Sequence, residues 1–182
     1  ADGVVVRIIT EPRTRLAALQ TGDIHITWLQ AQMLSVAERD SNVSVWPYAG
    51  VGFDAWIHTN GLPPFDDLRI RKAAVKSIDS EVVNNSIYLK TMLPNRQWHT
   101  FAPPSPFAVD LSELWQSELL RYDPVESLRL VKEYAEEKGL SLPLKIKGVC
   151  ERRSDRLHFC ELLQAEWKEV GLDFEFDVVA TP

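Results

Sequence analysis

The clearest hydrophobic pattern lies near the end of the sequence, where a helical period is followed by a strand period. Apolar side chains recur every three or four residues between Ser154 and Gly171, which predicts a helix that Ser154 caps and Gly171 ends. Residues 172–179 alternate between apolar and acidic side chains, which predicts a half-buried final strand. The predicted buried positions are Leu157, Cys160, Leu163, Trp167, Val170, Phe174, Phe176 and Val178.

Similar signals bound the elements upstream. Asp123 precedes a helix predicted over residues 124–138, and Gly139 ends it. Further helices are predicted over residues 12–22, 31–39 and 80–88, and strands over residues 4–9, 25–28, 43–48, 53–59 and 142–149. Residues 89–122 are predicted mainly as loop. This alternation predicts the α/β class, with a mixed β-sheet flanked by helices and with residues 4–9 and 172–179 in one sheet.

One further helix follows a pair of prolines. Pro63 and Pro64 hold the chain extended and cannot lie inside a helix. Asp66 is the predicted cap of the helix that follows, and Asp67 adds negative charge to its first turn. Asp79 is the predicted cap of the next helix. The predicted inner face of the first helix carries Ile70, Ala73, Ala74 and Ile78.

This stretch carries a resemblance to a known family. Residues 60–79 (NGLPPFDDLRIRKAAVKSID) resemble the signature N-x-x-x-P-P-F-x-D-x-R-V-R-x-A-x-x-x-A-I-D of the family 5 extracellular solute-binding proteins. Residues 14–26, 122–130 and 163–172 are similar to three further motifs of that family, in the expected order. The sequence departs from the family pattern at His25, where an acidic residue is usual, and at Val75, Ser77 and Ser127, where alanine is usual.

The resemblance implies an architecture and a function. Family members have two lobes around a cleft, and residues 1–182 resemble a single domain, the C-terminal-side lobe of a periplasmic binding protein of the type II, peptide-binding class. The other lobe and the return crossover are expected elsewhere in the polypeptide. The implied function is that of the substrate-binding component of an ABC importer, which captures a peptide or similar small polar solute by hinge closure. A ligand-sensing domain that feeds a regulatory module, and a hydrolase on the same scaffold, are the alternatives.

The same resemblance implies partners and a location. The partners would be the solute, the ABC permease subunits and the missing lobe of the same polypeptide. The protein would be periplasmic or extracellular, and associated with the membrane through the permease or a lipid anchor. Because residue Ala1 leads directly into an apolar segment without a signal peptide, we expect the sequence to be the interior of a longer precursor.

Candidate ligand-cleft residues come from three places in the sequence. Arginines at the start of the helix predicted after Ser154 would meet an anionic group together with the helix N–H groups. The favoured interpretation for them is a solvated cluster balanced by Glu151 and Asp155, and the alternative for the aromatic candidates is a place in the core. The candidates are Phe53, Asp54, Trp56, Trp98, His99, Arg152, Arg153 and Arg156.

Charge and motifs argue against other functions. The formal net charge is -6 and the basic residues are dispersed, which argues against nucleic acid as a partner. No H-E-x-x-H, G-x-S-x-G or phosphate-loop motif occurs, so we expect no enzyme activity, no metal site and no cofactor. Cys150 and Cys160 leave two interpretations open, a disulfide or two buried free thiols, and the free thiols are the favoured one.

Overall fold

The computed structural model describes residues 2–46, 61–90 and 121–180. These residues belong to two compact units, one within residues 1–48 and the other within residues 49–182.

The first unit contains two helices, α1 (Pro12–Gln20) and α2 (Ala31–Ala37), both of which the sequence predicts. The side chain of Glu11 begins α1 by accepting hydrogen bonds from the N–H groups of Arg13 and Thr14, at 3.1 and 2.6 Å. Gly22, with φ of +80°, allows the chain to turn after α1. Gln20 then donates a hydrogen bond to Asp40, 3.0 Å away, which joins the ends of the two helices.

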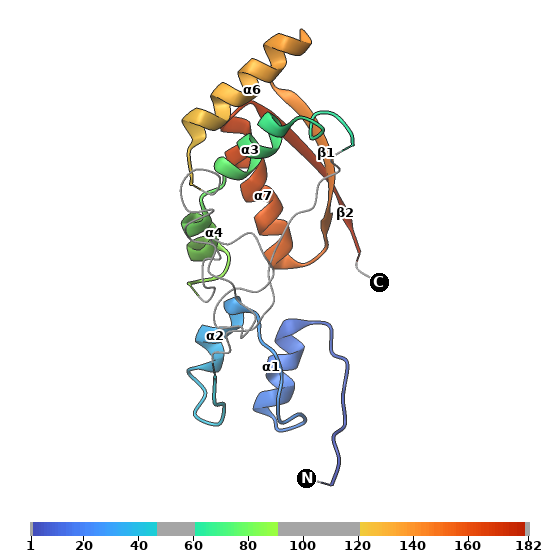
Figure 1. The fold of residues 1–182 in the computed structure, drawn as a ribbon. Helices are drawn as coiled ribbons and strands as arrows, with labels where there is room; N and C mark the ends of the chain where they lie inside the picture. Colours follow the sequence, from blue (N-terminus) through green and yellow to red (C-terminus); the bar gives the residue numbers. More distant parts are fainter. Residues whose placement is uncertain (1, 47–60, 91–120, 181–182) are drawn as a thin grey trace. The chain divides into compact units, whose positions relative to one another are not determined.

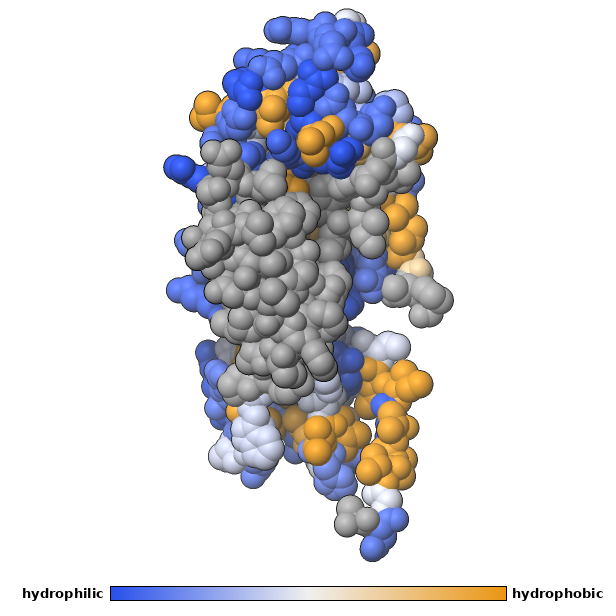
Figure 2. Space-filling view, viewed as in Figure 1, coloured by the Kyte–Doolittle hydropathy of each residue, from blue (hydrophilic) through white to orange (hydrophobic). Residues whose placement is uncertain are grey.

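The strands predicted for this unit are absent from its described residues. Residues 4–9 and 25–28 are not strands, and neither are residues 43–46, so these predictions are wrong. Apolar residues near the N-terminus stay exposed, as Figure 2 shows, with Val4 at 85% and Ile8 at 91%. A strand forms only where a neighbouring strand accepts its hydrogen bonds, and no strand pairing occurs among residues 2–46.

The second unit begins with two helices, α3 (Leu68–Lys76) and α4 (Ser80–Ser86). Asp67 caps α3 by accepting a hydrogen bond from the N–H of Arg69 at 2.8 Å, so the prediction of Asp66 as the cap is wrong by one residue. The Arg69 guanidinium also binds the Asp67 carboxylate, which fixes the cap there. Asp79 caps α4 as predicted.

The rest of the second unit is a strand–helix–strand arrangement that follows a long helix (Figure 1). In chain order its elements are α6 (Pro124–Lys138), β1 (Leu144–Glu151), α7 (Ser154–Glu169) and β2 (Leu172–Val179). β1 and β2 pair in parallel, from Leu144 opposite Leu172 to Glu151 opposite Val179. The predicted α/β class is therefore confirmed, and the sheet formed by the described residues is a two-stranded parallel one.

The predicted boundaries of α6 and β2 agree with the structure, while the start of α7 does not. Arg153, not Ser154, is the N-cap of α7, because its carbonyl already accepts the N–H of Leu157 at 2.9 Å. Asp123 and Gly139 bound α6 as expected. The strand predicted over residues 53–59 and most of the predicted loop over residues 89–122 lie outside the described residues.

The core of the second unit is centred on Trp167, whose side chain is 1% exposed. Its ring lies 6.1 Å from that of Phe65 and 5.1 Å from that of Phe174, and its Nε1 donates a hydrogen bond to the Ala74 carbonyl at 3.1 Å. The predicted apolar stripe of α7 is buried or packed against this core. Val178 is 41% exposed, so its prediction as buried is wrong, because burial along β2 extends only as far as Phe176.

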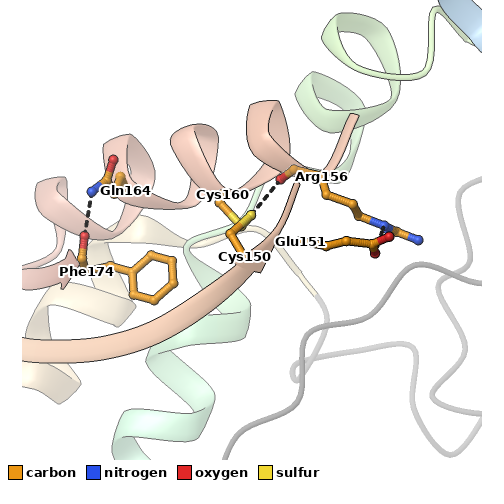
Figure 3. The surroundings of a disulfide bond; sticks show 6 residues. All are labelled: Cys150, Glu151, Arg156, Cys160, Gln164 and Phe174. Atoms are coloured by element: carbon orange, nitrogen blue, oxygen red, sulfur yellow. Dashed lines mark hydrogen bonds and ion pairs between the residues drawn. A yellow bond between two sulfur atoms is a disulfide. The ribbon is translucent and has the colours of Figure 1, made fainter. Parts of the chain in front are cut away.

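Cys150 and Cys160 form a disulfide, so the favoured interpretation as free thiols is wrong (Figure 3). The end of β1 and the second turn of α7 bring the two Cα atoms to 6.5 Å, which is within reach of a disulfide. The bond joins strand to helix across the turn that holds the arginine cluster.

Candidate functional site

The candidate site lies where the two strands end. Because β1 and β2 are parallel, their carboxyl ends meet at the same edge of the sheet. The N–H of Arg152 donates to the Val179 carbonyl at 2.8 Å, which extends the pairing one residue past Glu151. In open α/β sheets, ligands bind outside the carboxyl ends of the strands. We refer to residues 151–156 together with Val179 as the carboxyl edge.

Arg153 is paired within this edge. Its Nε donates to Asp155 Oδ1 at 2.7 Å, and its Nη2 binds Asp155 Oδ2. These hydrogen bonds lower the pKa of the Asp155 carboxyl, whose side chain is 8% exposed. Arg153 and Asp155 therefore form a fork-like pair whose charges largely cancel.

Arg156 makes a weaker pair on the same turn. Its Nε lies 3.9 Å from Glu151 Oε2, at the limit for an ion pair. Figure 3 draws the two side chains facing each other beside the disulfide. The carbonyl oxygen of Arg156 lies 3.2 Å from the Cys150 sulfur, so the disulfide contacts the first turn of α7. One turn further into α7 than Cys160, Gln164 donates to the Phe174 carbonyl at 2.7 Å and binds the helix to β2. The disulfide to β1 and the Gln164 bond to β2 therefore fix the part of α7 that follows the arginines.

Arg152 is the third arginine of the carboxyl edge. Its side chain is exposed, and among the described residues no ion pair includes its guanidinium. The nearby start of α7 has no side-chain cap, so the first N–H groups of the helix are not bound by the N-cap side chain. A guanidinium beside such a helix start can bind a carboxylate through charge-assisted hydrogen bonds.

The structure brings together the three predicted arginines and leaves the other candidates untested. Arg152, Arg153 and Arg156 lie together at the carboxyl edge, where two of them are engaged with neighbouring carboxylates, and their role in a ligand cleft stays a prediction. The remaining candidates lie outside the described residues and stay predictions: Phe53, Asp54, Trp56, Trp98 and His99.

The proline-rich signature segment has a structural role that the sequence pattern did not reveal. Arg71 donates from Nη1 to the carbonyls of Phe65 and Asp66, at 2.7 and 3.0 Å. Arg69 binds Asp67 and also Glu137 of α6, the latter at 2.8 Å. The two arginines therefore hold the loop before α3 in the position that places Phe65 on Trp167. The signal that could have indicated this is two arginines at alternate positions just after the proline pair.

The described residues hold neither a metal-binding cluster nor a membrane-spanning helix. Nowhere in residues 2–46, 61–90 and 121–180 do three His, Cys, Asp or Glu side chains gather in a way that could hold a metal ion. None of the helices in these ranges has the length and hydrophobicity that crossing a bilayer requires.

Comparison with known proteins agrees with the resemblance. The family model for bacterial extracellular solute-binding proteins, family 5 Middle, matches residues 1–182. The dipeptide-binding protein of Escherichia coli is 21% identical over 179 residues, which are 94% of this chain and 31% of that protein. The chain thus spans about a third of the length of this relative.

Solved structures show the same fold at low identity. DppA from Helicobacter pylori, an ABC transporter-associated periplasmic binding protein in complex with the peptide STSA, has a TM-score of 0.72 at 20% identity, over 96% of this chain and 32% of that one. NikZ from Campylobacter jejuni, in complex with Ni(L-His), has a TM-score of 0.70 at 18% identity, over 96% and 35%. The family match over all of its residues places this chain among the family 5 bacterial extracellular solute-binding proteins.

Proposed function

We propose that this chain is one lobe of the substrate-binding component of an ABC importer. The lobe would capture a peptide or similar small polar solute and present it to the membrane permease, without catalysing a reaction. The observation that carries the proposal is the exposed guanidinium of Arg152, which makes no ion pair with the described residues, at the carboxyl edge of a sheet in a chain of this family.

The geometry suggests how the edge would act. Arg152 follows directly after β1, and its backbone is held to β2 by the bond to Val179. The disulfide holds the neighbouring turn to the same strand. A guanidinium on such a fixed base can bind a solute carboxylate with little loss of backbone freedom. Closure of a second lobe over the edge would then remove the solute from water.

The proposed function also implies a second lobe and a cellular location for the protein. A single lobe offers half of a cleft, so the other half would come from the missing lobe. Disulfides form and persist outside the cytosol, so the Cys150–Cys160 bond supports a periplasmic or extracellular location. Association with the membrane would come through the permease or a lipid anchor.

Titration calorimetry of the complete gene product with a panel of di- to pentapeptides would test the proposal. Arg152→Ala should weaken binding about 10- to 100-fold, since a hydrogen bond to a charged group contributes about 1.5–3 kcal/mol. Lys147→Ala is the matched control, because Lys147 is an exposed cation on β1, away from the end of the strand that Arg152 follows, and it should leave affinity unchanged. Equal affinity of the Arg152 variant and the parent would place the solute elsewhere. Turnover of peptide or ester substrates would favour the hydrolase alternative.

A further inference from the structure

A second polar contact in this unit lies away from the carboxyl edge, between α7 and the start of α4. Glu166 of α7 accepts the backbone N–H of Asp79 at Oε1, 3.3 Å away. Its other oxygen, Oε2, is buried and has no hydrogen-bond partner among the described residues. A buried carboxylate oxygen without a partner is costly when the group is charged and much less so when it is protonated.

Two described contacts attach the ends of α4 to the rest of the unit. None of the side chains of α4 is buried, and Val82 on this helix is 41% exposed. At its C-terminal end, Ile87 is 3% exposed and provides one anchor. At its N-terminal end, the bond from Asp79 to Glu166 provides the other. Loss of this second anchor would leave the first turn of α4 without a described hydrogen bond to α7.

The charges around Glu166 disfavour its ionised form. The Asp79 carboxylate is fixed nearby because it caps α4 through the N–H groups of Glu81 and Val82, at 2.9 and 3.3 Å. Burial raises the pKa of Glu166 to about 7, and the Asp79 carboxylate adds to this rise while the Asp79 N–H bond opposes it.

Other charged groups on the surrounding elements do not offset this effect. Lys76, at the end of α3, helps Arg129 to lower the pKa of Glu126 in α6 and is not among the groups that perturb Glu166. Glu169, one turn further along α7, is exposed. Within the described part of the chain, Asp79 is therefore the charged neighbour that acts on Glu166.

We propose that Glu166 is a proton-controlled latch that holds the start of α4 on α7 when it is neutral and releases it when it ionises. On protonation, the carboxyl keeps its bond to the Asp79 N–H and loses its repulsion from the Asp79 carboxylate. On ionisation, the proton leaves to solvent, the two carboxylates repel, and the buried Oε2 carries charge that no donor offsets. The latch does not depend on the identity of any solute.

The direction of the pH effect follows from the raised pKa. In the detached state Glu166 would titrate near its ordinary value of 4.5, and in the attached state it titrates near 7. Attachment is therefore fully favoured below about pH 4.5, weakens as the pH rises from there to about 7, and is weakest above it. Because Glu166 is only partly buried, solvent screening reduces the effect well below what the full shift would give.

Hydrogen exchange of the α4 amides, corrected for intrinsic rates, would test the latch in the 182-residue chain at pH 5 and pH 8. The parent should lose protection about tenfold between these pH values, which corresponds to about one unit of the pKa difference. Glu166→Gln keeps the acceptor and removes the charge, so its α4 protection should be the same at both pH values. Glu169→Gln is the matched control and should behave as the parent does.

A second variant distinguishes the latch from a simple loss of folding. Asp79→Asn retains a capping oxygen and removes a charge that raises the pKa of Glu166, so the loss of α4 protection between pH 5 and pH 8 should be smaller than in the parent. Amides of β1 and β2 should keep their protection in every variant, which reports that the core is intact. An α4 protection that falls equally in the parent and in Glu166→Gln, or that does not change with pH in the parent, would overturn the proposal.

Discussion

Residues 2–46 and residues 121–180 both carry apolar patterns that predict helices and strands, yet only the second region forms strands. In the later region α6, β1, α7 and β2 all form, and their apolar side chains build a core around Trp167. In the earlier region α1 and α2 form, while Leu16 and Ala37 are its only buried apolar residues among those described. The two regions therefore differ in whether their predicted strands form, since helices form in both.

The difference has a physical origin in where hydrogen bonds are made. A helix satisfies its backbone within one segment, so a local pattern with a good cap suffices to form it. A strand needs a neighbour, and β1 finds β2 directly after α7. Residues 4–9 have no such neighbour among the described residues of their unit, and their apolar side chains remain exposed. An alternating pattern thus indicates which side chains a strand would bury. It does not indicate which other segment would pair with that strand.

Two tryptophans offer the largest test of this comparison. Trp167→Ala should lower the free energy of unfolding by about 3–5 kcal/mol, the range for removing a large buried aromatic side chain. Trp28 is 81% exposed in the earlier region, and Trp28→Ala should change the same quantity by less than about 0.5 kcal/mol. Urea denaturation followed by circular dichroism measures both. Similar losses in the two variants would break the comparison.

The disulfide provides the next largest effect. Cys150→Ala combined with Cys160→Ala should lower the free energy of unfolding by about 2–3 kcal/mol, because the bond closes a short loop with a sequence separation of 10. Reduction of the parent with dithiothreitol should give a loss of similar size. Mass spectrometry of the unreduced protein after thiol alkylation provides the control, and two alkylated cysteines there would contradict the disulfide.

The smallest effect separates two adjacent aspartates. Asp67→Ala removes the cap of α3 and the partner of Arg69, and should lower the free energy of unfolding by about 1–2 kcal/mol. Asp66 is exposed and contributes only its main-chain carbonyl to Arg71, so Asp66→Ala should change stability by less than about 0.5 kcal/mol. Thermal unfolding of the two variants side by side would measure the difference. A larger loss at Asp66 would restore the cap that the sequence predicts.

The sequence is informative wherever the determining contact is local. It predicts Asp123 and Gly139 as the residues that bound α6, and it predicts which side chains of α7 are buried. It also identifies the three arginines of the carboxyl edge as a cluster. It does not distinguish Asp67 from Asp66, because either residue can cap a helix and the choice depends on how Arg69 binds. These are differences of one residue in otherwise correct elements.

The features that the sequence did not predict depend on contacts between separate elements of the fold. The Cys150–Cys160 bond depends on how strand and helix face each other across a turn, which periodicity does not report. Glu166 gives no sequence signal, because it resembles any polar residue on an amphipathic helix and its partner Asp79 is 87 residues away. The pairing of Arg153 with Asp155, which leaves Arg152 as the cation of the edge without an ion pair to the described residues, likewise depends on the three-dimensional arrangement.

The central claim is that the stability of this chain resides in the core of its second unit, and hydrogen exchange of the 182-residue chain tests it most directly. Amides of β1, α7 and β2 should exchange slowest and with a common free energy close to that of global unfolding. Amides of residues 4–9 should exchange within about tenfold of their intrinsic rates, because no strand pairing protects them. Protection of residues 4–9 equal to that of β1 would contradict the claim, since it would require these residues to be hydrogen-bonded within the chain.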